Sequence, residues 1–158
     1  MGNFSAEPPE AGSRAEPLVS VVTPFYNTED FLAECIESVL RQSYRNFEYI
    51  LSNNHSSDRS PQIAEEYARR DPRIRLIDHT EFLDQIGNYN RALRDISSSS
   101  KYLKIVQADD WLYPECLEKM VPVAEAHPSV SIVSAYCLRG REIANVGLPH
   151  STPVYSGR

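Results

Sequence analysis

Short runs of β-branched and aromatic residues alternate along this chain with longer stretches in which apolar residues recur every three or four positions. The first run, residues 18–23, stops at Pro24, and this pattern predicts a buried strand that leads into a loop. Residues 32–40 place apolar side chains at helical spacing, which predicts an amphipathic helix. Thr28 precedes that helix, and we expect its hydroxyl to cap the first turn.

The same alternation continues through the rest of the chain. Further strands are predicted at residues 47–51, 74–77, 102–106 and 130–136, and further helices at residues 60–68, 86–96 and 114–124. Strands that alternate with helices of about 10 to 14 residues are typical of crossover units. The sequence therefore predicts an α/β fold with a mostly parallel sheet and flanking helices.

Polar loops follow three of the predicted strands. Ligands of parallel sheets bind beyond the carboxyl ends of the strands, so we expect the loops at 23–27, 52–58 and 107–111 to share one rim. In the last loop, Asp109 and Asp110 offer the hard oxygen ligands that Mg²⁺ or Mn²⁺ prefers, and phosphates of a ligand would complete the coordination. The alternative is that both aspartates turn the chain and cap the next element.

Two aromatic side chains, Phe25 and Tyr26, stand between Pro24 and Asn27 in the first of these loops. They would form one wall of a slot for a nucleobase, or else they cover the edge of the sheet. The loop at 52–58, taken alone, is typical of a plain turn. The sequence contains no Gly-x-Gly-x-x-Gly fingerprint, Walker-type loop or Gly-x-Ser-x-Gly elbow, which disfavours ordinary dinucleotide-binding, ATPase and serine-hydrolase functions.

Composition narrows the class of protein further. A chain of 158 residues with 41% hydrophobic residues fits one domain with a single core. Its net charge of -6 argues against binding to nucleic acid or anionic membranes, since both depend on dense positive charge. The three cysteines lack zinc-ligand spacing and no apolar run is long enough for a transmembrane segment, so we expect a cytoplasmic protein. Residues 1–17 are predicted to be a disordered leader.

Four segments in a fixed order resemble the family 2 glycosyltransferases with the GT-A fold, a Rossmann-like α/β architecture. These segments are 19–27, 38–44, 53–58 and 107–111, and the resemblance covers residues 18–137. It implies an enzyme that transfers a sugar from a nucleotide diphosphate sugar to an acceptor, with inversion at the anomeric carbon and with a divalent metal, Mg²⁺ or Mn²⁺. The acceptor, whether saccharide, lipid or protein, is not specified by it.

The resemblance also implies roles for individual residues. Nucleotide-binding roles fall on Thr23, Pro24, Tyr26, Asn53, Asp58 and Asp109, and metal-binding roles fall on Asp109 and Asp110. The chain departs from the family pattern at two places. Asn53 and Asn54 stand where the family commonly has two aspartates, and an amide adds a donor to the acceptor oxygen of a carboxylate. Gln107 stands where the metal motif usually has a further aspartate, so we expect a weaker metal site.

The resemblance divides the chain into three parts. Residues 1–17 form the leader, residues 18–137 form the nucleotide-sugar-binding part, and residues 138–158 begin a truncated acceptor-side region. The general base that activates the acceptor is expected beyond Arg158. Two other functions stay open from the sequence. One is a non-catalytic nucleotide-binding or interaction module that retains the fold, and the other is a nucleotidyltransferase.

Overall fold

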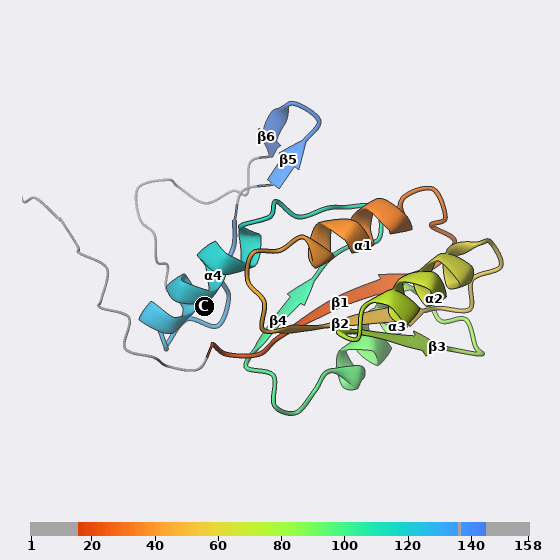
Figure 1. Cartoon of the computed structure of the whole chain (residues 1–158), viewed down its shortest axis with the longest axis horizontal. Helices are drawn as coiled ribbons and strands as arrows, with labels where there is room; N and C mark the ends of the chain where they lie inside the picture. Colours follow the sequence, from red (N-terminus) through yellow and green to blue (C-terminus); the bar gives the residue numbers. More distant parts are fainter. Residues whose placement is uncertain (1–15, 136, 145–158) are drawn as a thin grey trace, which may run out of the picture. The chain divides into compact units, whose positions relative to one another are not determined.

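The computed structural model describes residues 16–135 and 137–144. Its centre is a four-stranded parallel sheet in the order β3-β2-β1-β4 (Figure 1). The strands are β1 Val19–Phe25, β2 Phe47–Asn53, β3 Ile74–Asp78 and β4 Tyr102–Ile105. This architecture confirms the predicted α/β fold with a parallel sheet.

The two central strands carry the core. Every residue of β1 is buried, and β2 is buried at all positions except Glu48. Such strands are covered on both faces, which explains why their sequences are nearly continuous apolar runs rather than alternating patterns. The register pairs Phe25 with Asn53, and Asn53 with Asp78, so the strands end together at one edge of the sheet.

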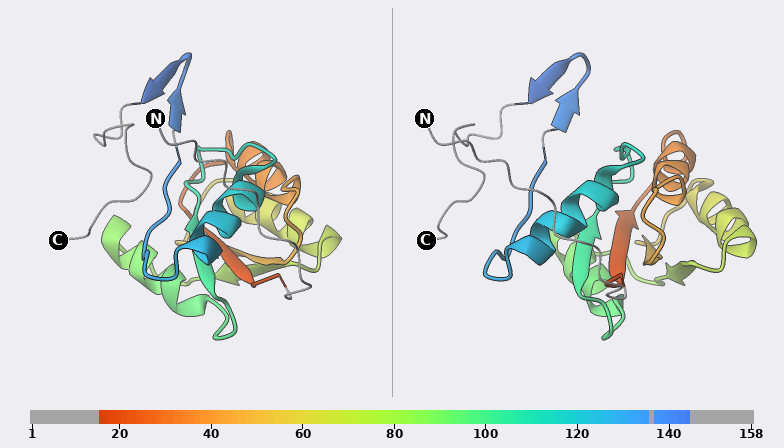
Figure 2. Two further views of the ribbon diagram at one scale, coloured as in Figure 1. Left: turned by 90° about the vertical axis from the view of Figure 1, so that its left-hand side faces the viewer. Right: turned by 60° about the vertical axis from the view of Figure 1, so that its left-hand side comes forward.

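Helices cover both faces of the sheet. Helices α1 Leu32–Leu40 and α2 Ser60–Arg70 contact each other on one face, whereas α3 Gln85–Ala92 lies on the opposite face and contacts β1 (Figures 1 and 2). A 3-10 turn, Leu93–Asp95, continues α3. This arrangement follows from the strand order, because the chain must cross from β3 at one edge to β4 at the other.

The described residues from 116 onward, 116–135 and 137–144, belong to a second compact unit. It contains α4 Cys116–Ala126, which includes Pro122, and an antiparallel hairpin of β5 Cys137–Arg139 and β6 Glu142–Ala144. Gly140 adopts a φ of 64° in the turn of this hairpin, a left-handed conformation that glycine allows without steric cost. None of the described helices is long and apolar enough to cross a membrane.

Two local predictions were wrong. The predicted strand at 130–136 is irregular over 130–135, where no described strand pairs with it, and Tyr136 lies outside the described residues. An apolar alternation forms a strand only when a neighbour supplies hydrogen bonds. The expected cap at Thr28 is also different. Its backbone carbonyl, rather than its hydroxyl, accepts hydrogen bonds from the amides of Phe31 and Leu32, at 3.0 and 2.9 Å. The predicted leader at 1–17 lies outside the described residues except for its last two.

Candidate functional site

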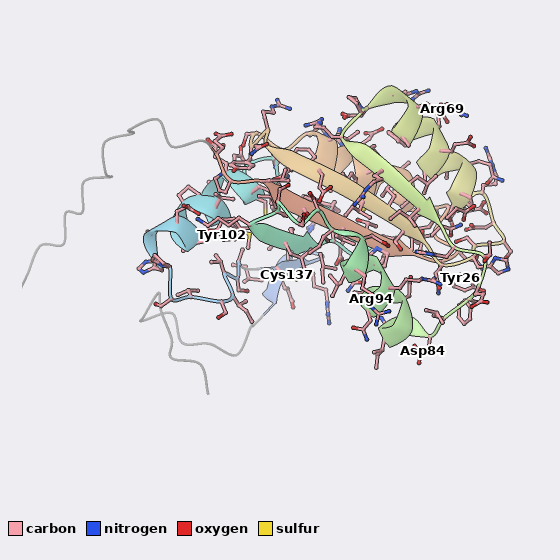
Figure 3. All side chains as sticks on the ribbon, turned by 90° about the horizontal axis from the view of Figure 1, so that it is seen from below. Tyr26, Arg69, Asp84, Arg94, Tyr102 and Cys137 are labelled. Carbon is pink, nitrogen blue, oxygen red and sulfur yellow. The ribbon has the colours of Figure 1, made fainter. Side chains whose placement is uncertain are left out.

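A cleft of about 430 Å³ opens at the carboxyl edge of the parallel sheet. Its lining comes from four parts of the chain: the loop after β1, the first residue after β2, the segment that includes α3, and the loop after β4. Figure 3 shows Tyr26, from the first of these parts, and Asp84, which precedes α3, on the same end of the sheet. The strand order therefore brings together residues that are more than 80 positions apart, from Pro24 to Asp109.

Part of the cleft lining is aromatic. The rings of Tyr26 and Phe82 lie with their centroids 4.8 Å apart and their planes tilted by 57°. Both side chains remain about half exposed, at 45% and 56%. The pair therefore presents an apolar surface that a planar ligand can stack against.

The loop after β2 uses its polar side chains within the protein. Asn53 donates from its amide nitrogen to Oδ1 of Asp78 at 2.6 Å, and its Oδ1 accepts from the Ser56 amide at 3.0 Å. Asp58 accepts from the backbone amides of Ser60 at 2.9 Å and Glu29 at 3.0 Å. Partial burial raises the pKa of the Asp58 carboxyl, but these hydrogen bonds outweigh it and hold the pKa below its ordinary value.

Asn54, the first residue after β2, holds the segment before α3 in place through side-chain hydrogen bonds. Its side-chain nitrogen donates to the Leu83 carbonyl at 2.8 Å, and its Oδ1 accepts from the Leu83 amide at 3.0 Å. The same oxygen accepts from the Arg91 guanidinium at 2.6 Å. Leu83 is the residue after Phe82 in the chain. The hydrogen bonds from the Asn54 side chain to Leu83 therefore help to position Phe82 in the cleft wall.

The loop after β4 adds an acidic residue to the cleft lining. Asp109 lines the cleft, Asp110 follows, and both side chains are exposed. The turn that carries them is closed by the Asp110 amide, which donates to the Gln107 carbonyl at 3.0 Å. That carbonyl also accepts from the Cys35 thiol at 3.3 Å, and Tyr89 donates from its hydroxyl to Gln107 Oε1.

Two groups beneath the acidic turn stay protonated near neutral pH. Burial raises the pKa of the Cys35 thiol to about 11, and the charges of Asp110 and Asp109 raise it further against opposing hydrogen bonds. Burial, together with the same two charges, raises the pKa of Tyr89 above its ordinary value. A neutral thiol is a weak nucleophile, so Cys35 serves as a donor that supports the turn.

The carboxylates of Asp109 and Asp110 suit a divalent cation. Neither has a hydrogen bond or an ion pair from its side chain within the described parts of the chain. Those parts contain no group of three or more histidine, cysteine, aspartate or glutamate side chains that could hold a metal. A cation here would therefore take one or two protein oxygens, and a phosphorylated ligand would supply others, as is common for Mg²⁺.

The predicted site residues fall into two groups. Pro24, Tyr26 and Asp109 line the cleft, and Asp110 adjoins it. Three others do not line it: Thr23, Asn53 and Asp58. Thr23 is fully buried, with its hydroxyl 3.0 Å from the hydroxyl of Tyr49 in the core.

Sequence reasoning missed the wall formed by the segment after β3. Its cleft-lining members are Phe82, Leu83, Gln85, Asn88 and Tyr89. A signal was present, because β3 was predicted as a parallel strand and its carboxyl end had to share the same edge. The sequence prediction assigned ligand loops to the strands now seen as β1, β2 and β4, and none to β3.

Comparison with known proteins agrees with this geometry. The sequence model of Glycosyl transferase family 2 matches residues 20–151. A Bacillus subtilis (strain 168) protein named "Uncharacterized glycosyltransferase EpsJ" is 38% identical over 109 residues, covering 69% of this chain and 31% of that protein. The chain thus spans about a third of the length of the curated relatives it matches.

Solved structures share the fold. TarS of S. aureus, in a complex with UDP, superposes with a TM-score of 0.63 at 23% identity, over 70% of this chain and 32% of that one. The mannosyltransferase PcManGT of Pyrobaculum calidifontis, in a complex with GDP-Man and Mn²⁺, gives a TM-score of 0.56 at 25% identity, over 61% and 28% of the two chains. Together, the family match, the relatives and the shared fold show that this chain belongs to glycosyl transferase family 2 and corresponds to the N-terminal portion of its GT-A fold.

Proposed function

We propose that this chain binds a nucleotide diphosphate sugar in the cleft and is the donor-binding portion of a glycosyltransferase. The observation that carries the proposal is one cleft whose lining includes both an aromatic pair, Tyr26 and Phe82, and a carboxylate, Asp109, that has no partner among the described residues. A nucleoside diphosphate combines the two matching chemistries, a planar base and charged phosphates. Its base would stack on Tyr26 and Phe82, and its diphosphate would face Asp109.

A divalent cation, Mg²⁺ or Mn²⁺, is part of the proposal. The net charge of the chain is -6, so a diphosphate brought next to Asp109 and Asp110 needs a cation to offset the repulsion. A bound cation would act as a Lewis acid that neutralises charge on the departing nucleoside diphosphate. The two carboxylates would hold the cation, and the neutral Tyr89–Gln107 pair beside them would add no further negative charge.

The reaction proposed is transfer of the sugar with inversion to a saccharide, lipid or protein acceptor. Inversion requires a general base that deprotonates the acceptor hydroxyl. In this proposal Asp109, the one carboxylate among the cleft-lining residues, holds the cation, and the role of the base is not assigned to a residue of the lining. The curated relatives carry glycosyltransferase names, so a non-catalytic nucleotide-binding or interaction module is not favoured.

Calorimetric titration of nucleoside diphosphates with and without Mn²⁺ tests donor binding. We expect binding to weaken at least tenfold when the metal is removed, because the diphosphate then faces two uncompensated carboxylates. Asp109→Asn should lose most of this metal dependence. Glu65→Gln is the matched control, since it removes one charge from an exposed position of α2 away from the cleft. A folded wild-type sample that binds no nucleoside diphosphate in the presence of Mn²⁺ would refute the proposal.

A further inference from the structure

One of the four segments that carry the family resemblance does not line the cleft. Segments 19–27, 53–58 and 107–111 each contribute residues to its lining, whereas none of residues 38–44 does, and the structure describes all of them. Residues 38–44 form the end of α1 and the chain directly after it. Contact with a ligand in the cleft therefore does not explain this segment, but its hydrogen bonds indicate another role.

Gln42, two residues after the end of α1, is completely buried. Its side-chain nitrogen donates to the carbonyl of Tyr113 at 2.7 Å and to the carbonyl of Ser38 at 3.2 Å. The Ser38 carbonyl belongs to the last turn of the helix, where carbonyls lack helical partners. A buried amide is unfavourable unless it is hydrogen-bonded, so these two carbonyls hold the side chain in place. One amide group thus joins the end of α1 to the chain just beyond Asp110.

Two other residues of segment 38–44 bind the same stretch of chain. The Ser38 hydroxyl accepts from the backbone amide of Leu112 at 3.1 Å, and Ser43 donates from its backbone amide to the Pro114 carbonyl at 2.9 Å. Residues 111–113 form neither helix nor strand, so their backbone groups depend on contacts of this kind. Segment 38–44 therefore fixes three consecutive residues after the acidic turn through their backbone.

The acidic pair lies between two attachments to the region of α1. Before the pair, the thiol of Cys35 in α1 donates to the Gln107 carbonyl at 3.3 Å, and after it, Gln42 holds the Tyr113 carbonyl. Figure 1 shows the chain passing beside α1 after it leaves β4. The neighbouring carboxylates repel each other and have no internal partner among the described residues, so their side chains do not fix the turn. The backbone contacts within the turn and on either side of it have that role.

We propose that Gln42 and Ser38 are positioning residues for the metal site, which hold the acidic turn in the conformation in which Asp109 and Asp110 bind a divalent cation. This inference rests on the proposed function, because the cation is the one that accompanies the donor diphosphate. Groups that orient metal ligands without touching the metal commonly raise metal affinity by about 10- to 100-fold. Both residues are buried and neither lines the cleft, so they act through the backbone of the turn.

Binding of Mn²⁺ in the presence of UDP, and separately of GDP, tests the inference, with the free ion measured by electron paramagnetic resonance. Gln42→Met removes the donor but keeps a side chain of similar length, and it should weaken Mn²⁺ binding about tenfold. Ser38→Ala removes the hydroxyl that binds the Leu112 amide, and the loss should be smaller. Gln62→Met makes the same change as Gln42→Met at an exposed position of α2 that does not line the cleft, and it should leave Mn²⁺ binding unchanged.

A double-mutant cycle separates positioning from a general loss of stability. Because Gln42 acts through the carboxylates, Gln42→Met should have little further effect on Mn²⁺ binding once Asp109→Asn has removed one of them. Each protein is measured at a temperature at which its circular dichroism is that of the folded state. Equal weakening by Gln42→Met with and without the Asp109 carboxylate would overturn the inference.

Trp111 provides a signal from the turn itself, since it is the only tryptophan of the chain and directly follows Asp110. Its ring is half exposed and contacts that of Tyr113, with the centroids 4.8 Å apart. When the Tyr113 carbonyl loses its donor, the ring should become more accessible. Quenching of its fluorescence by acrylamide should then increase in Gln42→Met and stay unchanged in Gln62→Met. An unchanged quenching constant in folded Gln42→Met would contradict the proposed positioning.

The remaining outcomes are also decisive. If the wild type binds Mn²⁺ with a nucleoside diphosphate and folded Gln42→Met binds it equally well, Gln42 has a structural role only, whereas the proposed donor-binding function stands. If Gln42→Met does not fold, Ser38→Ala decides, because weaker Mn²⁺ binding supports the inference and unchanged binding overturns it. If the wild type binds no Mn²⁺ with either nucleotide, the proposed function fails and this inference fails with it.

Discussion

The loop after β2 and the loop after β4 lie at the same edge of the sheet and are both rich in polar residues, yet they use these residues differently. In the first, Asn53, Asn54 and Asp58 direct their side chains to partners within the protein. In the second, Asp109 and Asp110 have no such partners among the described residues. A polar residue at this edge of the sheet can therefore have a structural role or be available to a ligand. Its hydrogen bonds within the protein distinguish the two roles.

The difference follows from the chemistry of the side chains. An amide both donates and accepts, so Asn54 binds the amide and the carbonyl of Leu83 together and fastens two segments. A carboxylate only accepts, and two adjacent carboxylates repel each other, so Asp109 and Asp110 gain little from a purely internal arrangement. The loop after β2 stabilises the cleft, and the loop after β4 leaves charge available to a ligand.

The largest effect should come from removing the amide that joins two walls of the cleft. We predict that Asn54→Ala lowers the free energy of unfolding by about 3 kcal/mol, because Leu83 and Arg91 lose three hydrogen bonds from a buried side chain. Urea unfolding monitored by circular dichroism measures the change. Asn90→Ala, at an exposed position, should cost less than about 0.5 kcal/mol. A cost below about 1 kcal/mol for Asn54→Ala would mean that the segment before α3 is held by other contacts.

A smaller effect is expected at Asp58, which accepts hydrogen bonds from two backbone amides. Asp58→Asn should lower the free energy of unfolding by about 1 kcal/mol at pH 7, the usual value for such a cap. The folded pKa of Asp58 lies below its ordinary value of 3.8. Its contribution is therefore complete above 3.8 and decreases as the pH falls through the lower folded pKa.

Urea unfolding of the wild type and of Asp58→Asn, measured from pH 7 down to values below 3.8, tests this prediction. The difference between wild type and Asp58→Asn should shrink as the pH falls below 3.8. A difference that stays constant over that range would show that the charge of Asp58 does not stabilise the fold.

The smallest effect on stability should be at the acidic turn. We predict that Asp109→Asn and Asp110→Asn each change the free energy of unfolding by less than about 0.5 kcal/mol in a buffer with EDTA, with a tendency to stabilise, because each removes repulsion without breaking an internal bond. Chemical unfolding measures this directly. A large destabilisation by either substitution would make the acidic turn a structural element like the loop after β2, and the contrast between the two loops would be lost.

Much of the fold was predictable because its signals are local. The four strands of the parallel sheet and the helices between them follow from runs of apolar residues and their spacing, and the structure contains these elements within a few residues of the predicted bounds. The family was also predictable, because the order of four short segments was enough to identify it. The predicted strand at 130–136 failed because pairing depends on a partner, which local pattern does not reveal.

The candidate site was only partly predictable. Pro24, Tyr26 and Asp109 were expected at a ligand site and line the cleft, although their roles there stay predictions. Phe82 and Asn88 were missed because nothing in their local sequence distinguishes them from ordinary surface and helix residues. Only the tertiary structure brings both residues to the cleft, where the Phe82 ring contacts that of Tyr26.

The sequence by itself determined the strands and helices, the parallel sheet that their alternation requires, and the edge at which polar loops gather. These properties depend on the spacing of apolar residues and on the order of the segments, and both can be read from the amino-acid sequence. Only the tertiary structure decided which of those polar groups are satisfied. Hydrogen bonds between segments some 30 residues apart, such as that from Asn54 to Leu83, satisfy some of these groups. The carboxylate of Asp109 has no such partner among the described residues and lines the cleft. That division depends on distances between side chains, which no local pattern specifies.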